Sequence, residues 1–242
     1  MALKPLLFGL AAAAGNLAGA IAVVRHQRRS LTLIETCLAF GAGFMMALVL
    51  VGVLPEVFGG SAPDASAGVL VLVGYVLVHL TQHAVTPHFH FGEETHAVKP
   101  GAGQSALVGL LLHSVFDGVA IATGFLVSFG LGALFFLAVL LHKLPEGVTI
   151  ASLMLAGGAT PRRAVWAGAA LGFATIAGVL LTDLLASLAR HGLALAAGVT
   201  LYVAASNLVP EFQATKSLRM TAAFLGGAAA LLLLRLLGSA SL

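Results

Sequence analysis

Apolar residues run along this chain in long blocks separated by short polar groups. A helix that spans a membrane needs about 20 mostly apolar residues. Stretches of roughly this length predict eight spans, at residues 5–24, 33–56, 67–86, 105–127, 131–156, 163–187, 192–212 and 219–238. The connections are short, apart from the one after the third span. The pattern favours an all-α polytopic membrane protein, with residues 1–242 as one transmembrane domain, over a soluble helical bundle.

The composition agrees with this fold class. Of the 242 residues, 60% are hydrophobic and 9% are charged, whereas a soluble domain carries about 25% charged residues. The 29 glycines suit membrane helices, because small residues let backbones approach closely. A net charge of +3 could indicate nucleic acid, but the basic residues lie at the predicted span ends. We therefore expect the lipid bilayer as a partner and no nucleic acid.

Lysine and arginine predict the orientation, because they concentrate on the cytoplasmic side of membrane proteins. If the N-terminus is outside, eight basic residues lie on the inner side and three on the outer side. The inner set is Arg25, Arg28, Arg29, Lys99, Arg162, Arg163, Lys216 and Arg219, and the outer set is Lys4, Arg190 and Arg235. We therefore expect both termini outside and the loop of residues 87–104 in the cytoplasm.

The fourth and fifth spans each place a histidine four residues before a carboxylate. His113 precedes Asp117, and His142 precedes Glu146. Residues four apart lie on one helix face, roughly 6 Å from each other, so two such helices could aim four ligands at one first-row divalent metal. The alternative is structural pairing between helices. Because an ionisable side chain inside a span costs roughly 2.5–3.5 kcal/mol, the doubled pattern favours a functional site.

The same two segments predict an internal repeat. Residues 112–122 and 141–151 share a Leu-His start and a Gly-Val-x-Ile-Ala end. Neighbouring spans run antiparallel, so the repeat would be inverted, as in transporters with a site at the midplane. Pro145 also frees a backbone carbonyl close to His142. Equally spaced Ala-Gly and Pro-Glu pairs in spans two and seven extend the prediction to an inverted 3+2+3 layout.

The segments HSVFDG at 113–118 and HKLPEG at 142–147 resemble the paired metal-site motifs of the ZIP (Zrt/Irt-like) divalent metal transporters. The resemblance implies import toward the cytoplasm of zinc first of all, and also of iron or manganese. The ion (Zn2+, Fe2+, Mn2+ or Cd2+) would be the transported substrate, with no catalytic cofactor. The family also implies a homodimer in the cell membrane (cytoplasmic or inner membrane), and an elevator-like motion of spans one, four, five and six against the other four.

The resemblance also implies the residues of the metal site. The matching positions are His113, Ser114, Asp117, His142 and Glu146. Met45 or Met46 lies where some members have a thioether ligand, with flexible core packing as the alternative reading. Two positions depart from members that hold a second metal, since Lys143 replaces a carboxylate and Thr175 replaces a glutamate. We therefore expect a single-metal site with an internal cation beside it.

Further polar residues cluster at the inner end of the third span and in the loop that follows it. The histidines there are His79, His83, His88, His90 and His96. Because neutral imidazoles bind zinc, copper, nickel and iron, we expect a secondary or regulatory metal loop, with an incidental polar loop as the alternative. Elsewhere in the spans, Asn16 and Asn207 are expected to bond across helices or to line the inner pathway.

Two other functions use the same residue types. An intramembrane hydrolase could activate water on zinc, but no His-Glu-x-x-His helix is present in the sequence. A metal sensor could use the histidine loop, but no signalling domain is attached. We therefore interpret the chain as a transporter without enzymatic activity.

Overall fold

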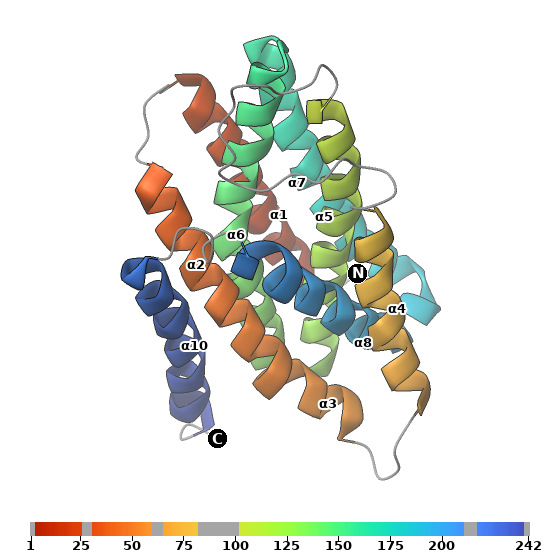
Figure 1. The fold of residues 1–242 in the computed structure, drawn as a ribbon. Helices are drawn as coiled ribbons and strands as arrows, with labels where there is room; N and C mark the ends of the chain where they lie inside the picture. Colours follow the sequence, from red (N-terminus) through yellow and green to blue (C-terminus); the bar gives the residue numbers. More distant parts are fainter. Residues whose placement is uncertain (1–2, 26–30, 60–64, 82–101, 211–216, 240–242) are drawn as a thin grey trace.

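The computed structural model describes residues 3–25, 31–59, 65–81, 102–210 and 217–239, and within these ranges it contains helices and no strands. The helices are α1 (Leu3–Arg25), α2 (Leu31–Ala47), η1 (Leu48–Val53), α3 (Leu54–Phe58), α4 (Ala65–Leu80), α5 (Ala102–Val127), α6 (Phe129–Ala156), α7 (Pro161–Leu184), α8 (Ala186–Tyr202), η4 (Val203–Leu208) and α10 (Leu218–Ser239). Figure 1 shows them as a helical bundle. The all-α prediction is confirmed.

Seven helices of the described chain are long and apolar enough to cross a membrane. They cover residues 3–25, 35–58, 106–127, 129–156, 161–184, 191–208 and 218–237. α4 is also apolar but has 16 residues, and the span predicted at 67–86 continues beyond the described residues. The chain is therefore a multi-pass membrane protein, whereas eight spans and outside termini stay predictions.

Helix ends differ from the predicted ones where a local signal starts or ends a helix within an apolar run. α6 begins behind Ser128, whose side chain accepts a hydrogen bond from the Leu131 amide at 3.1 Å. α7 starts at Pro161, a residue suited to a first helical turn. Leu185 then adopts an extended backbone, so α7 ends three residues before the predicted limit of 187. Apolarity alone does not mark such ends, because it continues through the break.

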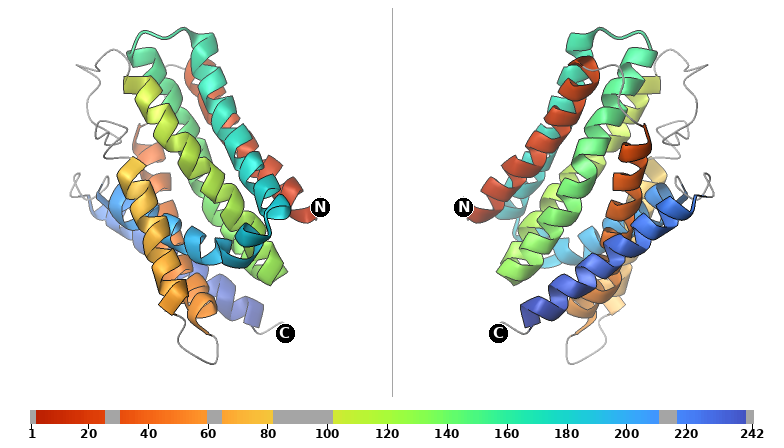
Figure 2. Two further views of the ribbon diagram at one scale, coloured as in Figure 1. Left: turned by 90° about the vertical axis from the view of Figure 1, so that its right-hand side faces the viewer. Right: turned by 90° about the vertical axis from the view of Figure 1, so that its left-hand side faces the viewer.

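The helices divide into a group of four and two pairs. α1, α5, α6 and α7 pack against one another, while α2 packs on α10 and α4 packs on α8 (Figures 1 and 2). α8 also contacts α5, and α2 also contacts α6. α5 and α6 carry the histidine–carboxylate motifs. They therefore lie at the boundary between the group of four helices and the two helix pairs.

The helix contacts recur in corresponding pairs along the chain. α1 packs on α6 as α7 packs on α5, and α2 packs on α10 as α8 packs on α4. Glycines make the corresponding contacts. A Cβ at Gly19 would collide with the backbone at Leu144, and one at Gly178 with the backbone at Val115. Leu144 and Val115 occupy the same position in the two repeated segments. These paired contacts are those expected of an inverted 3+2+3 layout, which stays a prediction.

The second and seventh spans both contain a π-helical segment before a proline. η1 starts seven residues before Pro55, and η4 starts seven residues before Pro210. Proline has no N–H, so the carbonyl four residues earlier loses its helical donor. For Pro55 that carbonyl is Val51, and the Arg235 guanidinium of α10 donates to it at 2.5 Å. The two π-helical segments thus lie at the same position relative to the Pro-Glu pairs that the sequence showed in these spans.

Candidate metal site

The paired motifs lie inside the bundle on facing helices. α5 carries His113 and Asp117, α6 carries His142 and Glu146, and each of these residues is at most 4% exposed. The site is therefore shielded from solvent on all sides in this structure.

Three of the four side chains form a compact cluster. One ligand atom each from His113, Asp117 and His142 lies within 4.8 Å of the others. The Nε2 atoms of His113 and His142 lie 3.2 Å and 3.4 Å from the same carboxylate oxygen, Asp117 Oδ2. Two imidazoles and a carboxylate that converge in a buried site are a donor set suited to a divalent metal.

The orientation of His142 is set by a backbone carbonyl. Its Nδ1 lies 3.0 Å from the Ala138 carbonyl oxygen, which can only accept, so Nδ1 carries the proton. In the neutral ring Nε2 then presents a lone pair toward Asp117. Two acceptors that face each other favour a cation between them, and a metal-binding histidine commonly bonds a carbonyl through its other nitrogen.

Glu146 does not belong to this cluster, because it is turned toward three hydrogen-bond donors. Its Oε2 accepts from Lys143 Nζ at 2.6 Å and from Asn16 Nδ2 at 3.1 Å, and its Oε1 accepts from Ser114 Oγ at 3.2 Å. Sequence spacing placed Glu146 on the correct helix face. It could not show that these partners hold the carboxylate away from the two imidazoles.

Lys143 points into the site and bridges its two carboxylates. The side chain is fully buried, and Nζ lies 2.7 Å from Asp117 Oδ2, 2.6 Å from Glu146 Oε2 and 2.9 Å from Ser114 Oγ. An ammonium group has three N–H donors, and here each has an oxygen partner. The cation therefore occupies a position formed by three oxygen atoms beside the histidine cluster.

Asn16 of α1 is a site residue that sequence reasoning did not include in the site. It is fully buried and donates to Glu146, as described above. The internal repeat held a signal for it, since Asn16-Leu17-Ala18-Gly19 in α1 corresponds to Thr175-Ile176-Ala177-Gly178 in α7. A search for repeats around the singled-out Thr175 would have identified Asn16 as its counterpart.

The remaining predicted site residues are Thr175, Pro145, Met45 and Met46. Thr175 is buried, but its hydroxyl donates to Leu171 of its own helix at 3.2 Å. Pro145 is buried inside α6. Met45 is 1% exposed within the apolar core, and Met46 is only partly buried.

Of the five histidines at the end of the third span and in the loop after it, the structure describes His79. His79 lies edge-on to the ring of Tyr202, with centroids 5.7 Å apart. The other four, His83, His88, His90 and His96, lie outside the described residues.

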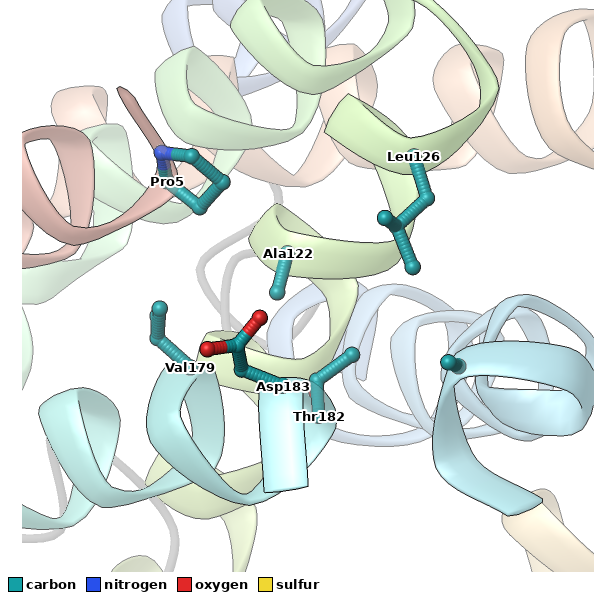
Figure 3. A pocket seen from close by; sticks show the side chains of 7 residues that line it. Pro5, Ala122, Leu126, Val179, Thr182 and Asp183 are labelled. Atoms are coloured by element: carbon teal, nitrogen blue, oxygen red, sulfur yellow. The ribbon is translucent and has the colours of Figure 1, made fainter. Parts of the chain in front are cut away.

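A separate cavity of about 100 Å³ lies near the ends of α1, α5 and α7. Figure 3 shows Pro5, Ala122, Leu126 and Asp183 around it, with the Asp183 carboxylate among the lining side chains. Ala122 follows Asp117 by five residues on α5, or about 7.5 Å along the helix. The cavity therefore lies beyond the site, toward the end of the bundle that holds the N-terminal end of α1.

Comparison with known proteins identifies relatives of this chain. Residues 92–235 match a protein-family model described as ZIP Zinc transporter. The zinc transporter YKE4 of Saccharomyces cerevisiae is 24% identical over 224 residues, a match that covers 77% of this chain and 63% of the yeast protein. The chain thus matches less than two thirds of that relative's length.

Proposed function

Since the chain belongs to the ZIP zinc transporter family, we propose that it carries a divalent metal cation across the membrane, zinc first of all, with iron, manganese and cadmium as further substrates. The name of the yeast relative supports zinc. Membership of a transporter family favours transport over hydrolysis within the membrane. The buried cluster within the spans does not favour a metal sensor over a carrier.

The observation that carries this proposal is the convergence of His113, Asp117 and His142 inside the bundle. Ionisable groups at this depth are costly, and a transported cation would offset that cost by binding them. Zinc prefers four ligands in a tetrahedron, so we propose that Glu146 supplies the fourth when the ion enters. Its carboxylate lies on the same face of α6 as His142, one turn away.

We further propose that the site takes one metal ion because Lys143 already fills the adjacent cation position. Two unit charges 4 Å apart repel by about 4 kcal/mol at an effective dielectric of 20, and a divalent ion doubles this. The short contacts from Nζ to both carboxylates support the view that the ammonium acts as a built-in cation. Ser114 supports both groups, since it accepts from Lys143 and donates to Glu146.

The transport mechanism we propose is elevator-like alternating access toward the cytoplasm. The group of α1, α5, α6 and α7 would move against α2, α4, α8 and α10, and the packing of these helices supports that division. The cavity at Asp183 supports an approach from the outer side, since a carboxylate attracts cations. Eight spans, outside termini and a homodimer in the cytoplasmic or inner membrane complete the proposal.

The histidine loop and the methionines have subordinate roles in this scheme. We propose that His79, His83, His88, His90 and His96 receive or sense metal on the cytoplasmic side. Met45 or Met46 would offer a thioether to the passing ion. The burial of Met45 in the core between α2 and its neighbours is equally suited to packing.

Metal flux into proteoliposomes tests the proposed function. Purified wild-type protein should load radiolabelled zinc, and His113→Ala or Glu146→Ala should abolish this flux while the protein still inserts, because each change removes a proposed ligand. Thr123→Val is a matched control. Thr123 is a polar residue as buried as His113 and Glu146, and its hydroxyl donates to the Val119 carbonyl of its own helix. Flux above a quarter of wild type in both ligand variants would disprove the assigned site.

A further inference from the structure

Within the described part of the chain, the Asn16 side chain makes one hydrogen bond, and its geometry indicates its role. Nδ2 donates to Glu146 Oε2 at 3.1 Å, and the amide oxygen Oδ1 is buried without a hydrogen-bond partner among the described residues. A 180° turn of the amide would place Oδ1 against the carboxylate, and two acceptors repel. The amide is therefore oriented to donate to Glu146. This orientation leaves its own oxygen without a hydrogen bond, which is unfavourable in a buried site.

The backbone of α1 holds this amide in place. A Cβ at Gly147 would collide with the backbone carbonyl of Asn16, and one at Gly19 with the backbone at Leu144. A Cβ at Gly15 would come within 3.1 Å of the Lys143 Cβ. With the two helices in such close contact, the amide has little freedom to move away from Glu146.

The corresponding position on the other repeat makes no such contact. Thr175 occupies it on α7, where the backbone is packed equally closely against Gly118, but the Thr175 hydroxyl bonds its own helix. Asp117 therefore receives no donor from α7 and joins the histidine cluster, whereas Glu146 receives an amide from α1 and stays outside it. The difference between the two carboxylates coincides with the difference between Asn16 and Thr175.

We propose that Asn16 is a positioning residue that holds Glu146 away from the metal cluster, so that Glu146 joins a bound ion only when this hydrogen bond breaks. This inference rests on the proposed function, in which Glu146 is the fourth ligand. A bond that is present in the empty site and absent from the loaded site lowers the apparent affinity for metal. Its removal should therefore tighten binding and slow release.

The test measures zinc affinity in purified full-length protein by competition with a chromophoric chelator. Asn16→Leu, nearly isosteric, and Asn16→Ala, which cannot overpack the helix contact, should each lower the Kd about tenfold, equivalent to 1.4 kcal/mol. Flux assays should show KM and the maximal rate falling together. Thr123→Val, a buried polar change away from the site, should leave all three quantities within twofold of wild type.

A double-mutant cycle makes the test specific to Glu146. In a Glu146→Ala background the acceptor of the Asn16 hydrogen bond is gone, so adding Asn16→Leu should change the Kd less than twofold. An unchanged or weaker affinity in both single variants would overturn the inference. So would an equal tightening with and without Glu146, or failure of both variants to fold with zinc present, because each would indicate a packing role. Absence of zinc binding by wild-type protein would instead disprove the proposed function.

Discussion

Replacement of Lys143 by methionine should destabilise the metal-free protein and make its stability depend on zinc. The ammonium lies 2.7 Å from Asp117 and 2.6 Å from Glu146. At an effective dielectric of 20 each pair is worth about 6 kcal/mol of attraction before desolvation is subtracted. Removal of one partner from a buried ion pair costs about 3–5 kcal/mol net, because the other partner keeps its charge without compensation.

Thermal unfolding in detergent gives the measurement. For a chain of this size a change of 3–5 kcal/mol corresponds to a loss on the order of 10 °C in Tm. Zinc should restore most of the loss in Lys143→Met, because the ion can neutralise the two carboxylates, and it should raise the Tm of wild type less. Lys4→Met is the matched control, since Lys4 is exposed and its ring contact with Phe129 is worth about 1 kcal/mol or less.

Metal stoichiometry provides a second test of the proposed role of Lys143 as a built-in cation. Wild type should bind one zinc ion per chain between α5 and α6, and Lys143→Asp should bind two, because it exchanges a repelling charge for a ligand. Thr175→Glu added to Lys143→Asp should tighten the second ion. Anomalous scattering from crystals soaked in zinc or cadmium counts the ions directly. Two strong peaks in wild type, or a metal-free Lys143→Met as stable as wild type, would refute the argument.

Two further predictions concern the histidine loop and the helix packing. Replacement of His88, His90 and His96 together by serine should preserve maximal zinc flux and change only its apparent affinity or regulation, because the buried cluster is untouched. Complete loss of flux in a folded triple variant would contradict this. Gly43→Ala should destabilise the protein by about 1–3 kcal/mol in thermal unfolding, since its Cβ would collide with the Phe224 backbone. Gly226→Ala should change stability little, because its Cβ would meet only side-chain atoms of Phe40 at ordinary contact distance. Equal stability of the two glycine variants would refute the packing argument.

The sequence alone determined the fold class and the residue types of the candidate site. Long apolar blocks are a local property of the chain, and a helix is closed by local hydrogen bonds, so the helices could be predicted without knowledge of their neighbours. The same holds for His113 with Asp117 and for His142 with Glu146, because a spacing of four residues places both members on one helix face. The repeated residues of α5 and α6 also predicted an inverted relation between these two helices.

Tertiary structure decided how those residues divide their roles. Only the packing of α1 on α6 brings Asn16 to Glu146, and only the meeting of α5 with α6 places Lys143 between the two carboxylates. The same applies to the Arg235 guanidinium on the Val51 carbonyl, because donor and acceptor lie on helices far apart in the chain. The physical reason is that a buried charge takes its partner from whichever helix the backbone packing brings within about 3 Å, and that distance depends on residues far apart in the chain.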